Sequence, residues 1–267
     1  MPELPEVESI RRVLKNSLIN QKLQKYKIFD QRINRFNSVN PRNLGVLFEI
    51  NRKGKILQFN FKNNSIFFHL GMSGRIQVND KKNKHTRARF YFDKDTVNFD
   101  DIRRFGFINI IKAELKIDYL NKIGPDVLEI STKQSRIIID KSKKSKSLIK
   151  DFILNQKYMS GIGNIYANEI LFASRIHPET KVNALSSNNW KDFFNNTKKI
   201  MRLAIKNNGT TLSDMTYFLP YGEFGSNQNF LKIYSKTNCF NCGHIIDKIY
   251  INQRATYFCR KCQKLKN

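Results

Sequence analysis

The sequence lacks any long run of apolar residues and any export signal. No stretch approaches the roughly 18 consecutive apolar residues that a membrane-spanning helix requires. The N-terminal segment MPELPEVESI has acidic residues where a signal peptide has basic ones, and no apolar segment follows it. We therefore expect a cytoplasmic protein with no membrane-bound part.

Cysteine is scarce and confined to one end of the chain. Because all four cysteines lie within residues 239–267, they indicate one local site and exclude a disulfide framework for the whole protein. Four thiolates in two C-x2-C pairs are the ligand set of a closed, tetrahedral structural zinc site. We therefore expect one structural Zn²⁺, bound by Cys239, Cys242, Cys259 and Cys262.

Acidic residues are few relative to basic ones. The chain has 22 Asp and Glu against 48 Lys and Arg, a formal net charge of +26. Such a charge repels itself unless a polyanion is nearby, and each neutralised phosphate of a nucleic acid releases counterions. A codon bias of an AT-rich genome toward Lys, Asn, Ile and Phe would also raise the charge. The sequence has no basic amphipathic membrane anchor, so the charge favours a nucleic-acid partner.

The first part of the chain has the pattern of a β-rich domain that begins with a helix. Apolar residues recur at helical spacing over residues 7–18, and Pro5 suits the first turn of a helix. Short β-rich runs then follow one another between turn signals, which predicts an antiparallel sandwich or barrel. These runs are residues 46–50, 56–61, 66–70, 89–92 and 107–111.

The second part has helical patterns. Helices are predicted over residues 148–154, 165–173 and 190–205, and the glycines of YMSGIGN allow a tight turn before the middle helix. The preceding segment contains KSKKSKS and is interpreted as a linker, or as a stretch beside it that contacts phosphate. The predicted domains are a β-sandwich over 1–130, a linker over 131–147, a helical domain over 148–234 and a cysteine module over 235–267.

The cysteine module has the pattern of a β-hairpin. Residues 249–251 and 256–258 are predicted strands around QRA, a turn that would project Arg254 from a rigid tip. A zinc-bound basic hairpin suits contacts with phosphates or a groove. Zinc ribbons also occur in ribosomal and transcription proteins, so the module narrows the partner and leaves the reaction open. His244 lies close by and is not needed as a ligand.

The N-terminus carries a candidate nucleophile. Methionine is normally removed before a small residue, which would expose the secondary amine of Pro2. An α-amino group has a pKa of about 7.7–8, so a useful fraction is neutral at pH 7 and can form a Schiff base with a sugar aldehyde. Glu3 and Glu6 lie within one turn and can protonate the sugar oxygen. Alternatively, these acids only complement the helix dipole.

Five motifs favour the catalytic interpretation. PELPEVE at the start, HLGMSG at 69–74, RRFG at 103–106, GIGNIYANE at 161–169 and the cysteine pairs occur in this order. Together they resemble bacterial formamidopyrimidine-DNA glycosylases over essentially the whole length. Each motif alone is weak, whereas five in the correct order and spacing are specific.

This resemblance implies a fold and an activity. The fold would be α+β, with an antiparallel β-sandwich and an N-terminal helix, then a helix–two-turn–helix domain and a zinc-finger hairpin. The activity would be excision of oxidised purines such as 8-oxoguanine and formamidopyrimidines from double-stranded DNA, followed by strand cleavage through β,δ-elimination.

The resemblance also implies residue roles at the reacting sugar. Pro2 would be the nucleophile, Glu3 the acid and Glu6 a supporting carboxylate. Lys55, in NRKGKIL, would contact the phosphate beside the lesion and aid β-elimination, although a solvated loop lysine is the alternative. Arg254 would grip phosphates and assist the second elimination.

Further residues would bind DNA. Met72, Arg103 and Phe105 would fill the hole left by the everted base, which offsets part of the cost of flipping, although Met72 and Phe105 could instead be core residues. Asn164 and adjacent amides would bind phosphate at a helix N-terminus, and Glu169 could line the base pocket. His85, Lys146 and Lys150 are further phosphate candidates, for which a solvated surface role is the alternative.

The sequence departs from the family pattern at three places. Ile102 replaces the usual proline before the paired arginines, and Gly54 replaces a commoner non-glycine residue beside Lys55. The segment 216–229, which should include the lid over the extruded base, matches poorly. Lesion preference is therefore the least determined property.

Three alternatives compete with an oxidised-purine glycosylase. Endonuclease VIII, in the same superfamily, removes oxidised pyrimidines, but its members begin PEGPE where this chain has PELPE. A non-catalytic DNA-binding protein would not need the intact Pro2-Glu3 pair. A zinc-ribbon translation protein leaves the N-terminal motif unexplained. Nothing in the sequence indicates an oligomer, and we expect a monomer.

Overall fold

The computed structural model describes residues 2–35 and 44–265. The chain divides into two compact units. The sandwich unit comprises residues 1–122 and 204–228, and the helical unit comprises residues 123–203 and 229–267. Within the described residues, no helix is both long enough and apolar enough to cross a bilayer.

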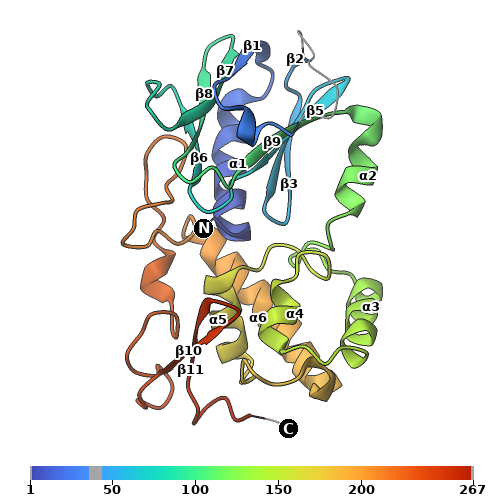
Figure 1. Cartoon of the computed structure of the whole chain (residues 1–267), viewed down its shortest axis with the longest axis vertical. Coiled ribbons are helices and arrows are strands. Elements are labelled where there is room, and N and C mark those ends of the chain that lie inside the picture. The colour runs from blue at the N-terminus through green and yellow to red at the C-terminus, as the bar shows by residue number, and fades with distance from the viewer. Residues whose placement is uncertain (1, 36–43, 266–267) are drawn as a thin grey trace. The chain divides into compact units, whose positions relative to one another are not determined.

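The sandwich unit contains one long helix and two antiparallel sheets (Figure 1). Helix α1 (Leu4–Leu18) precedes all the strands, and the short helix α2 (Lys116–Asn121) follows them. The five-stranded sheet has the order β2 (Gly45–Val46), β1 (Lys22–Ile28), β7 (Thr86–Phe92), β8 (Thr96–Asp101) and β6 (Gly74–Val78). The four-stranded sheet has the order β3 (Glu49–Lys53), β4 (Ile56–Asn60), β5 (Asn64–His69) and β9 (Phe107–Lys112).

The predicted β-sandwich and N-terminal helix are confirmed. The five predicted runs fall on β2 and β3, β4, β5, β7 and β9, whereas β1, β6 and β8 carried no prediction. Polar residues explain the omission, because β1 reads KLQKYKI with one fully buried position and β8 ends in two aspartates. Burial of such strands depends on their neighbours in the sheet, which local patterning does not contain.

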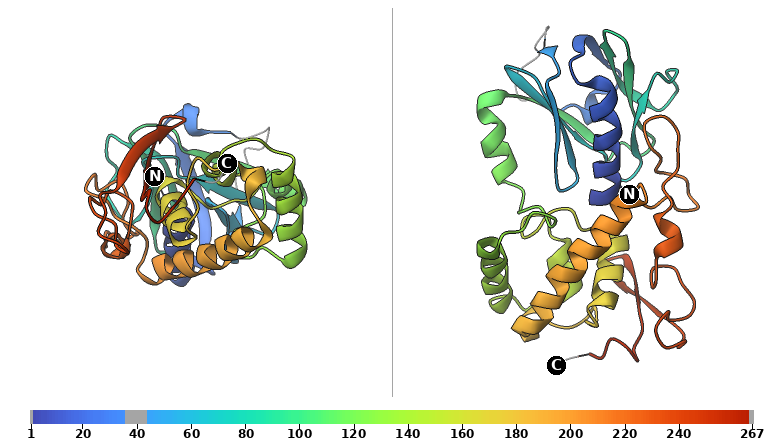
Figure 2. Two further views of the ribbon diagram at one scale, coloured as in Figure 1. Left: turned by 90° about the horizontal axis from the view of Figure 1, so that it is seen from below. Right: turned by 180° about the vertical axis from the view of Figure 1, so that it is seen from behind.

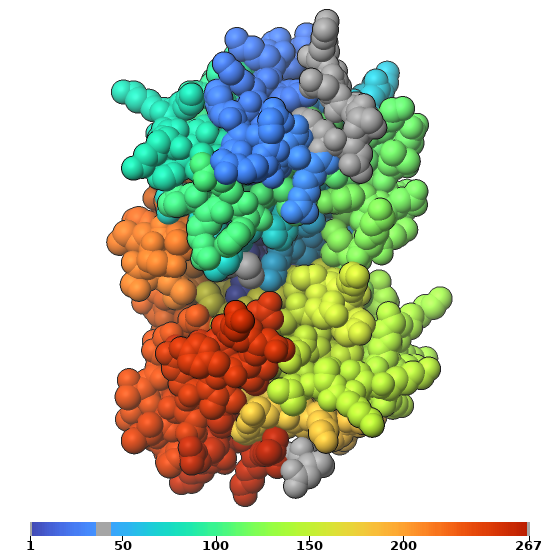
Figure 3. Space-filling view, in the orientation of Figure 1, coloured from blue at the N-terminus to red at the C-terminus, as the bar shows by residue number. Residues whose placement is uncertain are grey.

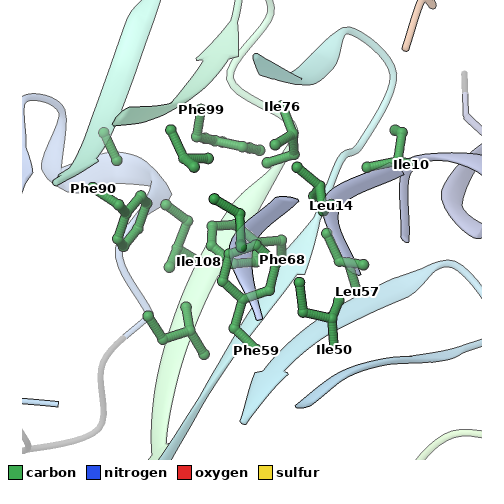
Figure 4. Close-up of a cluster of buried hydrophobic side chains, with 14 of the residues drawn as sticks. Ile10, Leu14, Ile50, Leu57, Phe59, Phe68, Ile76, Phe90, Phe99 and Ile108 are labelled. Atoms are coloured by element: carbon green, nitrogen blue, oxygen red, sulfur yellow. The ribbon is translucent and has the colours of Figure 1, made fainter. Parts of the chain in front are cut away.

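Aromatic side chains of both sheets form the centre of the core (Figure 4). The ring of Phe68 lies 4.9 Å from that of Phe59 and 5.4 Å from that of Phe90. Ile10 and Leu14 of α1 join the same cluster. Such aromatic pairs add about 0.5–1.5 kcal/mol each beyond the area they bury. The core therefore joins α1 to both sheets.

Helix α1 lies beside β3 (Figure 2), and an ion-pair cluster joins the two elements. Glu8, 8% exposed, accepts hydrogen bonds from Arg11 (Nη2–Oε1, 2.8 Å), from Arg12 (Nε–Oε1, 3.0 Å) and from Arg52 of β3 (Nε–Oε2, 3.2 Å). Burial opposes ionisation of this carboxyl, but the three guanidinium groups outweigh it and lower its pKa to about 2. The start of α1 is thereby held against β3.

The helical unit contains four helices and a C-terminal hairpin. The helices are α3 (Thr132–Lys143), α4 (Ile149–Leu154), α5 (Asn164–Ala173) and α6 (Ser187–Lys206), although the last residues of α6 are counted with the sandwich unit. The hairpin consists of β10 (Asp247–Ile251) and β11 (Arg254–Phe258). Four 3-10 turns complete the secondary structure of the described chain: Gln31–Ile33, Ala113–Leu115, Val182–Ala184 and Asn227–Phe230.

The predicted helices at 148–154, 165–173 and 190–205 match α4, α5 and α6, but the segment interpreted as a linker contains α3. Ser131 and Gln134 form a capping box, in which the Ser131 hydroxyl accepts from the Gln134 N–H at 3.2 Å and the Gln134 side chain accepts from the Ser131 N–H at 2.9 Å. Of the apolar residues in α3, only Ile138 is fully buried, so the apolar period is too weak to indicate a helix.

The Glu8 cluster predicts a pH-dependent stability. The pKa in the folded state lies below the unfolded value of about 4.3, so the stabilisation is complete above that pH and is lost as pH falls toward 2. The difference in unfolding free energy between wild type and Glu8→Gln should therefore shrink between pH 5 and pH 2. Urea unfolding at several pH values measures it.

Glu114→Gln is the matched control, because Glu114 is exposed and pairs only loosely with Lys112 at 3.7 Å. This substitution should leave the pH profile unchanged. A Glu8→Gln difference that stayed constant from pH 5 to pH 2 would contradict the assignment.

Candidate active site and nucleic-acid interface

Pro2 and Glu3 lie at the N-terminus of α1 in the sandwich unit, and both are buried. Glu3 is the N-cap residue of a capping box: its side chain accepts from the backbone N–H of Glu6, and the Glu6 Oε2 accepts from the Glu3 N–H at 2.8 Å. The two carboxyls are only 1% and 2% exposed. The peptide that follows Pro2 is thus fixed by a buried, charged acceptor.

The second oxygen of Glu6 holds a loop from the far end of the sandwich unit. Thr210 donates its N–H to Glu6 Oε1 at 2.7 Å. The preceding Gly209 has φ +79°, and a Cβ there would lie 2.9 Å from the same oxygen, so a side chain has no room. Sequence reasoning missed this loop, although a glycine directly after a helix end, as in NNGTT, is a recognisable C-terminal signal.

Tyr217 packs beside this carboxyl. Its hydroxyl donates to the Asn208 carbonyl at 2.8 Å, and burial together with the negative charge of Glu6 raises the pKa of Tyr217 well above its ordinary value. Tyr217 therefore stays neutral and keeps the loop closed against Glu6.

Lys55 lies in the two-residue turn between β3 and β4. The pairing of Lys53 with Ile56 leaves Gly54 and Lys55 as the turn, and Gly54 has φ +58°. A type II′ hairpin turn prefers glycine at its first position, which explains this departure from the family pattern. Lys55 is only 9% exposed, so it is not the solvated loop lysine of the alternative interpretation.

His69 belongs to the same neighbourhood and carried no prediction. Burial and the nearby charges of Lys55 and Arg35 lower its pKa to about 4, so the imidazole is neutral at pH 7. Its Nδ1 accepts from the Gly71 N–H at 3.2 Å, and its ring stacks on Phe107 at 5.1 Å. His69 therefore orders the turn that carries Met72.

Met72, Arg103 and Phe105 lie on two loops that touch. Met72 follows β5 and is 39% exposed, and Phe105 follows β8 and is 54% exposed. The Arg103 guanidinium lies 4.9 Å from the Phe105 ring centroid. A Cβ on Gly71 would approach the Gly106 nitrogen to 2.5 Å, so the backbones of the two loops are in contact. The interpretation of Met72 and Phe105 as core residues is therefore wrong.

His85 is half-buried in the loop before β7. Its N–H donates to Asn83 Oδ1 at 2.8 Å, and its carbonyl accepts from the Asp101 N–H at 3.0 Å. Lys146 of the helical unit is exposed. The positions of these two residues are compatible with contacts to phosphate.

Lys150 differs from its prediction as a surface or phosphate-contacting lysine. It is 0% exposed, and its Nζ donates to the Ala255 carbonyl at 3.0 Å and to Thr256 Oγ1 at 2.6 Å. The Asn164 side chain donates to the same carbonyl at 3.0 Å, while its buried Oδ1 has no hydrogen-bond partner within the described chain. Two residues near helix N-termini thus hold the β10–β11 hairpin.

Arg254 lies beside the tip of the hairpin and not at the tip itself, where it was expected. Ile251 pairs with Arg254, so the turn consists of Asn252 and Gln253, both with positive φ as a type I′ turn requires. Arg254 is the first residue of β11, directly beside Ala255, and it is exposed. Figure 3 shows the C-terminal residues, drawn in red, on the surface of the helical unit.

The contacts of Glu169 also differ from its expected role. Its carboxylate accepts backbone N–H groups from Lys232 (2.9 Å), Ile233 (3.0 Å) and Tyr234 (2.8 Å). Burial raises the pKa of the Glu169 carboxyl, and these three bonds oppose the shift. Both oxygens are occupied by backbone, so the expectation that Glu169 lines a base pocket is not supported. Glu169 fixes the segment that leads into the cysteine module.

The four cysteines converge on one point. Cys239, Cys242, Cys259 and Cys262 each offer a sulfur, and all four sulfurs lie within 4.8 Å of one another. The individual separations of 3.5, 3.6 and 3.8 Å fit a tetrahedron with Zn–S bonds of about 2.3 Å, whose edge is roughly 3.8 Å. The site therefore fits one structural Zn²⁺ held by four thiolates, as predicted.

The candidate residues are thus divided between the two units. The sandwich unit carries Pro2, Glu3, Glu6, Lys55, Met72, His85, Arg103 and Phe105, and the helical unit carries Lys146, Lys150, Asn164, Glu169, Arg254 and the cysteines. A β-sandwich with a buried proline before its first helix, followed by a helical unit and a zinc hairpin, defines the zinc-finger class of DNA glycosylases.

Family models narrow this class. The formamidopyrimidine-DNA glycosylase N-terminal domain matches residues 1–108, the H2TH domain of the same glycosylase matches residues 123–216, and the zinc finger found in FPG and IleRS matches residues 239–265. The chain belongs to the formamidopyrimidine-DNA glycosylase family.

Sequence similarity to known relatives extends over nearly the whole chain. It is 36% identical to the formamidopyrimidine-DNA glycosylase of Mycoplasma genitalium, over 99% of this chain and 96% of that protein. It is 35% identical to that of Listeria monocytogenes, over 99% and 100%. Among solved structures, Lactococcus lactis Fpg with DNA containing an abasic site is 29% identical and has a TM-score of 0.88, with 98% of this chain and 100% of that chain covered.

The Lys150 contacts predict a local loosening of the hairpin. Lys150→Met removes the donor from the Ala255 carbonyl and from Thr256, at a cost of roughly 1–3 kcal/mol for buried groups left unsatisfied. Hydrogen exchange followed by mass spectrometry should show faster exchange over residues 247–258. Lys146→Met, an exposed control, should not change it, and equal exchange in both variants would refute the anchoring role.

Proposed function

We propose that this chain is a DNA-repair glycosylase and lyase that excises oxidised purines, such as 8-oxoguanine and formamidopyrimidines, and nicks the strand by β,δ-elimination. The observation that carries the proposal is the buried start of α1, where Pro2 precedes the reciprocal bonds between Glu3 and Glu6. The titles of the solved relatives name DNA that contains an abasic site or Fapy-dG. Those substrates have the sugar and the ring-opened purine that this chemistry requires.

The amine of Pro2 is the proposed nucleophile once Met1 has been removed. Its nitrogen forms a bond to C1′ of the damaged nucleotide, and the glycosidic bond breaks with its electron pair leaving on the base; the proton that the Pro2 nitrogen loses balances the proton that the base takes up. The C1′–O4′ bond then breaks, Glu3 protonates O4′, and the secondary amine becomes an iminium ion. Because the iminium withdraws electrons, loss of a C2′ proton expels the 3′ phosphate, and a second elimination expels the 5′ phosphate.

Glu6 supports this reaction without touching the sugar. Its two oxygens accept from Glu3 and Thr210, which fixes the peptide that follows the nucleophile. Lys55 lies in a rigid two-residue turn and supplies a positive charge toward the phosphate beside the lesion. Placing an amine, an acid and a cation in a fixed geometry is a large part of the rate enhancement that such a site can provide.

Met72, Arg103 and Phe105 are the proposed occupants of the gap in the duplex. Everting a base costs a few kcal/mol of stacking and pairing. Two exposed apolar side chains can stack in the gap, and the guanidinium can hydrogen-bond to the unpaired partner base. Their exposure in the absence of DNA is the feature that supports this role.

The helical unit is the proposed phosphate grip. The backbone amides at the start of α5, where Asn164 is the first residue, offer N–H donors to a phosphate, and Arg254 is exposed at the start of β11. The zinc ion would bring together the two cysteine pairs, and its chemistry is structural. His85 and Lys146 are further contacts to phosphate, and Lys150 acts through the hairpin that it holds.

We also propose a cellular location and an oligomeric state for the enzyme. We place it in the cytoplasm, on the DNA of the cell, and as a monomer acting on one duplex. The predicted domain division remains part of the proposal, with a catalytic domain over residues 1–130, helix–two-turn–helix over 148–234 and a zinc finger over 235–267.

A borohydride trapping assay tests the reaction. Wild type incubated with a duplex carrying 8-oxoguanine opposite cytosine should form a covalent adduct when borohydride reduces the iminium ion, and Pro2→Gly should form far less. A duplex with thymine glycol is the parallel substrate. Stronger trapping on thymine glycol would favour the pyrimidine-specific alternative, and no adduct on either duplex would refute the glycosylase proposal.

A further inference from the structure

Asp101 has a buried carboxyl group that takes no part in the proposed reaction. It is the last residue of β8 and is 0% exposed. Its Oδ1 accepts from the Ser73 hydroxyl at 2.6 Å and from the Arg103 N–H at 3.2 Å, and its Oδ2 accepts from the Gly106 N–H at 2.7 Å. Three protein donors therefore converge on one buried side chain.

These donors are the neighbours of the residues proposed to enter the DNA. Ser73 follows Met72, and Gly106 follows Phe105, while Arg103 itself is the third donor. The Ser73 hydroxyl also accepts from the Arg103 N–H at 3.0 Å, which closes the group. One carboxylate therefore connects the loop after β5 with the loop after β8.

The backbone of Asp101 reaches a third loop. Its N–H donates to the His85 carbonyl at 3.0 Å, and its carbonyl accepts from Arg87 Nε at 2.8 Å. In the sheet, Asp101 also pairs with Gly74. The loops that carry Met72, Arg103 with Phe105, and His85 thus all have a hydrogen bond to this residue or to its strand partner.

Close packing leaves the two principal loops little freedom. A Cβ on Gly106 would lie 2.7 Å from Phe99 Cζ and 3.1 Å from Asp101 Oδ2. Arg104 has φ +58°, an uncommon conformation for a residue with a side chain. The residue before Arg103 is Ile102, so no proline ring restricts the loop there. The bonds to Asp101 supply the restraint in its place.

We propose that Asp101 is a positioning residue that sets Met72, Arg103 and Phe105 for base eversion. It does not contact DNA, because its carboxylate is buried and both oxygens are occupied by protein donors. The inference rests on the proposed glycosylase function. Its consequence is selective: Asp101 matters for steps that open a duplex and little for chemistry on a sugar that is already accessible.

Asp101→Asn tests the proposal with little change in volume. The asparagine oxygen can still accept from Ser73, but its amide group faces the Gly106 N–H, so a donor meets a donor. Asp100→Asn is the matched control, because Asp100 is the adjacent residue of β8 and accepts from Asn83 at 2.7 Å. Ser73→Ala is a second variant that removes one donor and keeps the carboxylate.

Two substrates separate the roles. In single-turnover assays on an 8-oxoguanine·cytosine duplex, Asp101→Asn should excise roughly tenfold to hundredfold more slowly than wild type, as expected for misplaced groups. Ser73→Ala should be slowed to a smaller extent, and Asp100→Asn should match wild type. Nicking of a single strand with a preformed abasic site, which needs no eversion, should change little in all three variants.

Unchanged duplex excision in both Asp101→Asn and Ser73→Ala would overturn the inference. An equal loss on the duplex and on the abasic single strand would also overturn it, because it would indicate general damage to the sandwich unit. Wild type that is inactive on both substrates would refute the proposed function itself. The activity of wild type on the same substrates therefore distinguishes the two failures.

Discussion

The carboxylate of Glu6 accepts one backbone N–H from Glu3 and one from Thr210, residues that lie at opposite ends of the sandwich unit's sequence. The placement of Pro2 and Glu3 at the start of α1 depends on this pair of bonds. They define where α1 begins, and the peptide they fix is the one that follows Pro2. They also require glycine at position 209, because a side chain there would collide with the carboxyl. Behind them, Glu8 and its three arginines hold the same helix to β3.

Other buried charged side chains also hydrogen-bond to the backbone of a loop or hairpin: the carboxylates accept from N–H groups, and the ammonium group of Lys150 donates to a carbonyl. Asp101 binds the ends of two loops, Glu169 binds three successive amides before the cysteine module, and Lys150 binds the hairpin at Ala255 and Thr256. A buried charge is costly unless hydrogen bonds satisfy it. Each of these groups therefore holds a loop or a hairpin in one conformation. The loops held by Asp101 and the hairpin held by Lys150 carry residues with a proposed contact to DNA.

Much of this architecture could be predicted from local sequence. The zinc ligands followed from spacing alone, and the helices α4, α5 and α6 followed from apolar periodicity. The order of short motifs indicated the family, which the matching models and relatives confirm. These predictions were correct because the residues that determine each feature lie close together in the chain.

Other features depend on partners far away in sequence. Lys150 and Glu169 were assigned to DNA because nothing near them in the sequence reveals that their partners are Ala255 and the amides of residues 232–234. Asp100 and Asp101 are adjacent and chemically identical, and only the pairing of β8 with β6 and β7 decides which of them faces the two loops. Helix α3 was missed because its capping box, not an apolar face, marks its start.

The most direct test of the central role of Glu6 is the rate of borohydride-trapped adduct formation by Glu6→Gln on a duplex with a preformed abasic site. The glutamine keeps the size of the side chain but can accept only one of the two N–H groups, since its amide nitrogen is a donor. We expect a folded protein, with circular dichroism like that of wild type, whose trapping rate falls by roughly tenfold or more because its nucleophile is displaced. Trapping at the wild-type rate would contradict this role.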